Sequence, residues 1–204
     1  FWQQALGLGF VMLSILALRE DRKILFLFYV LVGALFHNTA IVFFLLYFAI
    51  VNIRNIHKLF LPLIFLIVFY FFIFDVDEAS RNFLNYVLEA SQVHSRGMFY
   101  RVSINVFSGI LFLFVIRKRV NNIYDKNIYT VLSILSFFIL GSSVLSSSFA
   151  DRFNYFIFPL HLYTITHFIS VLHSKSSKML SVTILIIIYL GMFISWLFYS
   201  AEKK

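Results

Sequence analysis

Apolar segments long enough to cross a membrane recur along this chain and leave few folds open to it. Examples are residues 128–145, 153–172 and 179–199, which fall within the roughly 17–25 residues that a membrane-spanning helix needs. Hydrophobic residues make up 61% of the 204 residues and charged residues only 13%, against about 25% charged in a soluble domain. The sequence therefore predicts an all-α, polytopic integral membrane protein.

The apolar segments and their short polar connections predict seven to eight membrane segments in a single transmembrane domain, residues 1–204. The segments cover residues 3–18, 24–51, 59–74, 102–116, 128–145, 153–172 and 179–199. Pro159 lies inside one of them, and we expect a kink there because proline removes a backbone hydrogen bond. Residues 146–152 are predicted to form a polar turn. Because Phe1 already lies in apolar sequence, we expect the chain to be part of a longer protein with further segments upstream.

The run at residues 24–51 is long for one crossing and short for two. If it crosses once, the 17 Lys and Arg residues divide almost equally, nine inside and eight outside. If it turns back near His37, as two short helices or as a re-entrant hairpin, eleven lie inside and six outside. Cytoplasmic loops carry an excess of Lys and Arg, so the turned-back arrangement is favoured. It places His37, Asp151 and Arg152 on the outer side.

The longest polar interval, residues 75–101, is predicted to be an extracytoplasmic loop. Within it, residues 79–92 are typical of a short amphipathic helix that lies on the outer membrane surface. Asp77 and Arg81 are four residues apart and can pair on such a helix. The alternative is a packed lid that carries no catalytic group.

Two arginines stand where the loop meets the next apolar segment. Arg96 and Arg101 flank Tyr100 at the predicted membrane surface. A guanidinium group stays charged and binds phosphate through two parallel hydrogen bonds, so this pair suits a lipid-linked phosphate. The alternative is an anchoring role, since Arg and Tyr commonly lie at the interface.

Asp151, Arg152 and His37 are the other candidates at the outer side. Arg152 and Tyr155 share a helical face, and Asp151 could be a catalytic base or a carboxylate favoured by the helix dipole. His161 lies roughly 13 Å further along the helix, and we expect it to be hydrogen-bonded and structural. His37 marks the reversal, where non-helical backbone must be buried in protein or line a cavity. There, Asn38 or Thr39 could instead cap a helix.

Metal and nucleic-acid functions are not indicated. The chain has no cysteine, and its histidines show no metal-ligand spacing. The net charge of +8 comes from basic residues at the ends of apolar runs, which the orientation rule explains without a nucleic acid. We expect no cofactor.

Three stretches resemble the EpsG-type branch of the Wzy polysaccharide polymerases. They are QQALGLGFVMLSI near the start, LVGALFHNTAIVFFLLYFAI after a basic step, and DRFNYFIFPL at the head of a late segment. The second carries the Phe-His-x-Ser/Thr-Ala signature, and the third has Arg152 and Tyr155 at the family's positions. Gln3 stands where the family has an arginine.

The resemblance implies polymerisation of undecaprenyl-pyrophosphate-linked oligosaccharide repeat units at the outer face of the bacterial cytoplasmic membrane, giving O-antigen, capsule or exopolysaccharide. The mechanism it implies needs a cationic clamp for the departing pyrophosphate and a base for the acceptor hydroxyl. From their predicted place at the outer face, we expect catalytic roles for Arg96, Arg101, Arg152, Asp151 and His37, and substrate binding by Tyr100, Tyr155, Arg81 and His94. The expected partners are the lipid-linked oligosaccharide, membrane lipid, a chain-length regulator and a flippase. The competing hypotheses are a flippase or transporter of lipid-linked oligosaccharide and a membrane acyltransferase. A transporter is expected to carry repeated halves and polar groups at the membrane midplane, and the sequence shows no repeat.

Overall fold

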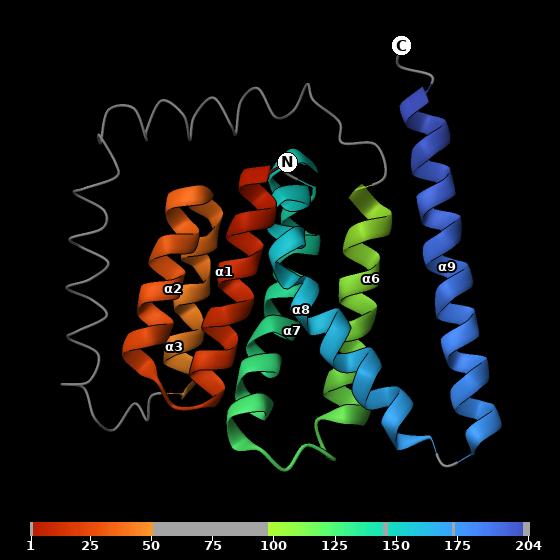
Figure 1. The fold of residues 1–204 in the computed structure, drawn as a ribbon, viewed down its shortest axis with the longest axis horizontal. Coiled ribbons are helices and arrows are strands. Elements are labelled where there is room, and N and C mark those ends of the chain that lie inside the picture. Colours follow the sequence, from red (N-terminus) through yellow and green to blue (C-terminus); the bar gives the residue numbers. More distant parts are fainter. Residues whose placement is uncertain (1, 51–97, 145–146, 173, 202–204) are drawn as a thin grey trace. The chain divides into compact units, whose positions relative to one another are not determined.

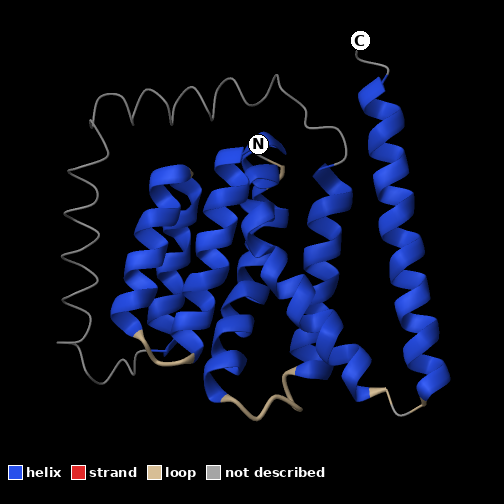
Figure 2. Cartoon of the chain, viewed as in Figure 1, coloured by secondary structure: helices blue, strands red, loops and turns tan. Residues whose placement is uncertain are grey.

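The computed structural model describes residues 2–50, 98–144, 147–172 and 174–201. Within these ranges the regular structure is helical and contains no strand (Figure 2). The seven α-helices are α1 (Trp2–Arg19), α2 (Lys23–Phe36), α3 (Leu45–Ile50), α6 (Met98–Leu111), α7 (Ile123–Ser142), α8 (Ser147–Val171) and α9 (Lys175–Ala201), and η1 (Asn38–Phe44) and η3 (Phe112–Ile116) are 3₁₀ and π segments (Figure 1). The all-α prediction is confirmed for this part of the chain. The predicted loop helix at residues 79–92 lies outside it.

Three helices of the described ranges are long and apolar enough to cross a membrane. They are α1, α6 continued by η3, and α7, and two shorter apolar helices cover Lys23–Phe36 and Asn38–Tyr47. The protein is therefore a multi-pass membrane protein. The full number of seven to eight segments stays a prediction.

The chain reverses at His37, as the distribution of basic residues predicts. His37 has an extended backbone (φ −153°), its N–H donates to Gly33 at 2.9 Å, and its carbonyl accepts from the N–H of Ala40 at 2.9 Å. The segments before and after His37 pack against each other, since Phe26 stacks with Tyr47 with their ring centroids 6.2 Å apart. Residues 24–50 thus form two short antiparallel helical arms (α2, and η1 with α3) that meet at His37 (Figure 1).

Glycines allow α1 and α2 to approach each other closely. A Cβ at Gly7 would lie 3.4 Å from the carbonyl oxygen of Gly33, and a Cβ at Gly33 would lie 3.4 Å from that of Gly7. Phe10 and Phe36 stack beside this contact, with ring centroids 5.6 Å apart. Small residues at such crossings increase van der Waals contact between helices, which is a main source of helix association in lipid.

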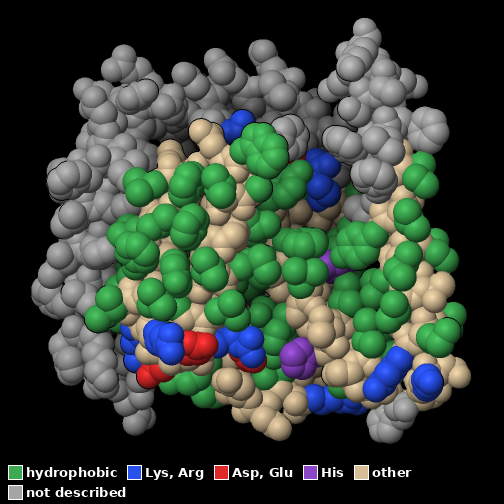
Figure 3. Space-filling view, viewed as in Figure 1, with side chains coloured by type: hydrophobic (Ala, Val, Ile, Leu, Met, Phe, Trp, Pro, Cys, Tyr) green, Lys and Arg blue, Asp and Glu red, His purple; other side chains and the backbone are tan. Residues whose placement is uncertain are grey.

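One end of the bundle is basic. Arg19 at the end of α1 donates from Nη2 to Oδ2 of Asp125 in α7 at 3.0 Å, so the turns that precede α2 and α7 lie together. Charged side chains gather over the α1–α2 turn (Figure 3). The Lys and Arg residues of these two turns and the first turn of α7 are Arg19, Arg22, Lys23, Arg117, Lys118, Arg119 and Lys126. We refer to this as the basic end; the orientation rule predicts that it is cytoplasmic.

Two helices begin earlier than their apolar sequence indicates. Asn122 starts α7 because its side-chain oxygen accepts from the backbone N–H of Tyr124 at 2.8 Å, a standard N-cap. Residues 147–152, predicted as a turn, form the first turns of α8 instead. Polar residues are tolerated there because the start of a helix leaves backbone N–H groups exposed. Pro159 lies within α8, and the helix continues past it.

By its internal contacts the chain divides into two compact units, residues 1–162 and residues 163–204. The second contains the end of α8 and all of α9, and in it the Tyr163 and His167 rings stack with centroids 4.0 Å apart. The candidate residues that the structure describes all belong to the first unit.

The orientation can be tested by cysteine labelling, since the chain has no native cysteine. Val144, which follows α7, is 86% exposed, and Asn121 is exposed at the basic end. We expect a membrane-impermeant maleimide added outside intact cells to label Val144→Cys and to spare Asn121→Cys until the membrane is opened. The opposite pattern would invert the orientation and remove the candidate site from the outer face.

Candidate functional site

Arg101 and Asp151 form a two-pronged ion pair between α6 and α8. Nε of Arg101 donates to Oδ1 of Asp151 at 2.6 Å, and Nη2 donates to Oδ2 at 2.8 Å. The Arg101 side chain is 31% exposed and that of Asp151 17%. Two parallel hydrogen bonds fix the plane of a guanidinium group, so Asp151 determines where Arg101 points.

Arg152 lies on a different side of α8 from Asp151. Neighbouring residues on a helix point about 100° apart, so Asp151 can face α6 while Arg152 faces elsewhere. Phe156, one turn after Arg152 on the same face, has its ring 5.4 Å from that of His37 and 6.1 Å from that of Phe43. The exposed Arg152 is thereby placed on the face of α8 that packs against the reversal at His37.

His37 lies in the break between α2 and η1, where three elements meet. Its ring packs on Phe156 of α8, its Cβ lies 3.2 Å from where a Cβ at Gly7 would be, and its Nδ1 is 2.6 Å from the hydroxyl oxygen of Thr39. Burial, and then the positive charge of Arg152, lower the pKa of His37 below its usual 6.5. Both effects favour the neutral imidazole over the imidazolium form.

Below the ion pair, two further polar contacts join α6 and α8. Asn105 donates from Nδ2 to the backbone carbonyl of Asn154 at 3.0 Å and to its Oδ1 at 2.8 Å. Ser108 Oγ lies 2.7 Å from Nδ1 of His161. All four residues are buried, and the predicted structural, hydrogen-bonded role of His161 agrees with this contact.

These contacts were not predicted for Asn105 and Ser108, although a signal was present. Arg101, Asn105 and Ser108 stand at i, i+4 and i+7, one face of a helix that is otherwise strongly apolar. Their partners on α8 follow in the same order, so the two helices run in the same direction here. The three contacts set the register of α6 against α8 and hence the height of Arg101 beside Asp151.

Of the remaining predicted site residues, the structure describes Tyr100 and Tyr155, and it shows no hydrogen bond from either to Arg101, Asp151, Arg152 or His37. Tyr100 is 77% exposed, and Tyr155 is 39% exposed. Arg81, His94 and Arg96 lie outside the described residues, so their roles stay predictions. Within the residues that are described, no group of three or more His, Cys, Asp or Glu side chains could hold a metal ion.

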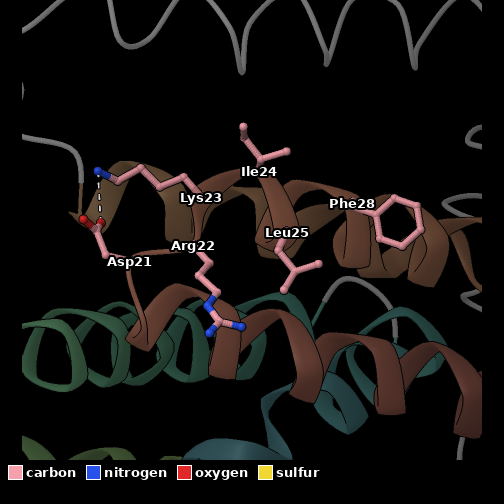
Figure 4. A pocket seen from close by; sticks show the side chains of 6 residues that line it. All are labelled: Asp21, Arg22, Lys23, Ile24, Leu25 and Phe28. Carbon is pink, nitrogen blue, oxygen red and sulfur yellow. Dashed lines mark ion pairs between the residues drawn. The ribbon is translucent and has the colours of Figure 1, made fainter.

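A surface hollow in the described part of the chain lies elsewhere, at the basic end. It has a volume of about 620 Å³ and is lined by Asp21, Arg22, Lys23, Ile24, Leu25 and Phe28 (Figure 4). Lys23 Nζ lies 3.0 Å from Oδ1 of Asp21, and Arg22 pairs with Glu20 at 3.1 Å, so its charges are partly neutralised locally. It is open and shallow, and it is separated along α1 from the Gly7–His37 contact. We do not place the chemistry there.

Comparison with known proteins gives a family and no individual relative. No curated protein and no solved structure matches the chain. The match to the EpsG family extends over residues 1–204, the entire sequence. It therefore includes the reversal at His37 and the Arg101–Asp151 pair, and the chain belongs to the EpsG family, a family linked to polysaccharide biosynthesis.

Proposed function

We propose that this protein polymerises undecaprenyl-pyrophosphate-linked oligosaccharide repeat units at the outer face of the bacterial cytoplasmic membrane. The observation that carries the proposal is the cluster of Arg101, Asp151, Arg152 and His37 at the end of the bundle away from the basic end. Family membership supplies the link to polysaccharide synthesis. Charged groups are costly near lipid and are seldom kept there without a functional or pairing role.

The reaction requires a group that stabilises the departing pyrophosphate. The bond between the anomeric carbon of the growing glycan and the pyrophosphate oxygen breaks, and a bond to the acceptor hydroxyl oxygen forms. The electron pair leaves with the lipid pyrophosphate, and Arg101 and Arg152 are assigned to bind its oxygens. Guanidinium groups suit this task because they remain charged and match phosphate geometry.

The acceptor hydroxyl must also lose its proton. Asp151 and His37 are the two groups of the cluster with the chemistry to accept one. Both oxygens of Asp151 already accept hydrogen bonds from Arg101, so the carboxylate is engaged in holding the guanidinium group. We therefore assign Asp151 the orientation of Arg101. Tyr100, Tyr155, Arg81 and His94 remain proposed substrate-binding residues, and Arg96 a proposed third cation.

Reconstitution of the full chain in liposomes with lipid-linked repeat units would test this function. We expect a ladder of glycans longer than one repeat, resolved by gel electrophoresis after release from the lipid. Unchanged repeats that cross the bilayer would instead identify a flippase. Transfer of an acyl group to the sugar would identify an acyltransferase. Either of these results without chain growth would overturn the proposal.

A further inference from the structure

The ring of His37 is fixed by three neighbours. Gly7 of α1 leaves room for its Cβ, Phe156 of α8 covers the ring, and the Thr39 hydroxyl lies 2.6 Å from Nδ1. Its backbone is fully used, since the N–H bonds to Gly33 and the carbonyl accepts from Ala40. Across the residues that the structure describes, Nε2 is the one hydrogen-bonding atom of His37 with no partner shown.

The direction of the Thr39–His37 hydrogen bond decides what Nε2 can do. Which ring nitrogen of a neutral histidine carries the proton is set by the bond that the other nitrogen makes. If the hydroxyl donates to Nδ1, the ring proton lies on Nε2, which becomes a donor. If Nδ1–H donates to the hydroxyl oxygen, Nε2 carries a lone pair and could accept a proton.

In the described part of the chain, the Thr39 hydroxyl makes a hydrogen bond to Nδ1 of His37 and to no other atom. Several other Ser and Thr hydroxyls donate to carbonyls of the preceding turn, as Thr130 does to Lys126 at 2.5 Å. Thr39 lies two residues after the extended His37, and its hydroxyl oxygen lies 2.6 Å from Nδ1 of that residue. A hydroxyl hydrogen turns toward the acceptor that is present.

We propose that Thr39 is a positioning residue that donates its hydroxyl hydrogen to Nδ1 of His37, so that His37 presents Nε2–H to an oxygen of the lipid-linked pyrophosphate. The assignment deepens the proposed function and rests on it for the identity of the ligand. It adds a neutral hydrogen-bond donor to the cationic site. It also explains the Phe-His-x-Thr spacing, because a threonine two residues after His37 can reach Nδ1.

The surroundings of the ring favour an anionic ligand. Arg152 lies one turn from Phe156 on the face of α8 that packs against His37, whereas Asp151 is turned toward α6 by its bonds to Arg101. The neighbours of His37 named above, Gly7, Phe156 and Thr39, carry no charge. A neutral N–H donor beside a guanidinium group is complementary to a phosphate oxygen and not to a cation.

It follows that His37 does not accept the hydroxyl proton in the reaction; the proton passes to an oxygen of the departing pyrophosphate, whose negative charge grows as its bond to the anomeric carbon breaks. With Nδ1 receiving a hydrogen bond and Nε2 protonated, the neutral ring has no free lone pair. An amide nitrogen can replace a donor of this kind, whereas it cannot replace a base. His37→Gln is therefore expected to retain about a tenth of the polymerisation rate, and His37→Ala much less.

Nitrogen NMR on the full chain, labelled with ring-¹⁵N histidine in detergent micelles, reads the tautomer directly. The signal that disappears in His37→Gln belongs to His37. We expect a protonated Nε2 and an unprotonated Nδ1, and a shift of the Nε2 signal when inorganic pyrophosphate is added. A protonated Nδ1 would overturn the role of Thr39, and an Nε2 signal unmoved by pyrophosphate would overturn the assigned ligand.

Substitutions of Thr39 test whether it acts through His37. Thr39→Val keeps the branched shape and removes the hydroxyl, so we expect a mixture of tautomers and a polymerisation rate lower by about 3- to 10-fold. Thr39→Ser should restore a single tautomer and most of the rate, and Thr130→Val is the matched control with no effect. In the His37→Gln background, Thr39→Val should add little further loss. An equal loss in both backgrounds would show that Thr39 is merely structural.

The two readouts separate this inference from the proposed function. If Nε2 is protonated and responds to pyrophosphate but the protein makes no polymer, the proposed polymerase function is overturned, while the proposed Thr39–His37 hydrogen bond stands. If the protein makes polymer and His37 is protonated on Nδ1, the polymerase function stands and the role of Thr39 is overturned.

Discussion

Exchanging the partners of the Arg101–Asp151 pair should restore the folded protein without restoring polymer synthesis. Arg101→Asp alone places two carboxylates together, and Asp151→Arg alone places two guanidinium groups together, so each single variant should be less stable. The double variant re-forms an ion pair between α6 and α8, but its cation now extends from α8. Loss of one correctly placed donor typically costs 10²–10³-fold in rate, and we expect about that loss. Thermal unfolding of the purified protein and the liposome polymerisation assay measure the two effects.

The chain contains a matched control for this experiment. Arg19 and Asp125 also join two helices by an arginine–aspartate pair, at the basic end. Because we assign that pair a structural role only, the exchanged variant Arg19→Asp with Asp125→Arg should recover both the unfolding temperature and the polymerisation rate. Full activity of the exchanged Arg101–Asp151 variant would show that this pair, too, only holds helices together.

Replacing Arg101 by lysine gives an intermediate case. Lysine keeps the positive charge and can make one of the two hydrogen bonds to Asp151, but an ammonium group has no planar fork. We therefore expect folded protein with partial activity from Arg101→Lys.

The sequence predicted the features that depend on simple counts along the chain. Helical membrane segments follow from hydropathy and length. The reversal at His37 follows from where the basic residues must lie, and the pairing of Phe26 with Tyr47 confirms it. Hydropathy is a property of each segment, and the distribution of basic residues is a sum over the chain. Neither depends on contacts between distant residues, so a single sequence is enough to predict both features.

Contacts between distant helices could not be predicted in the same way. Arg101 and Asp151 are 50 residues apart, and their sequence gives each a plausible separate role, as an interfacial anchor and as a carboxylate favoured by the helix dipole. Their pairing depends on the register of α6 against α8, which the buried Asn105 and Ser108 contacts set. Thr39 was interpreted as a possible helix cap, whereas its hydroxyl bonds to the neighbouring imidazole because His37 is extended.

A bulky side chain at Gly7 should disrupt the packing of α1 against His37. The added Cβ alone would lie 3.2 Å from Cβ of His37 and 3.4 Å from the Gly33 carbonyl, and the two methyl groups of Gly7→Val need further space. Overpacking of this kind typically costs 1–3 kcal/mol, and separation of α1 from α2 would move His37 away from Phe156. We expect a lower unfolding temperature and at least a roughly tenfold loss of polymerisation, since a displaced donor no longer meets its oxygen.

Gly9→Val separates packing from helix propensity. Gly9 lies in the same helix, and a Cβ there would meet nothing within 4 Å, so valine at this position carries the same cost in backbone and rotamer freedom without the clash. Gly9→Val should therefore keep near-normal activity and unfolding temperature. Ring-¹⁵N spectra should show a changed His37 signal in Gly7→Val and an unchanged one in Gly9→Val. If both variants polymerise equally well, close contact between α1 and the reversal is not what holds His37 in place, and its position must depend on Phe156 and Thr39 alone.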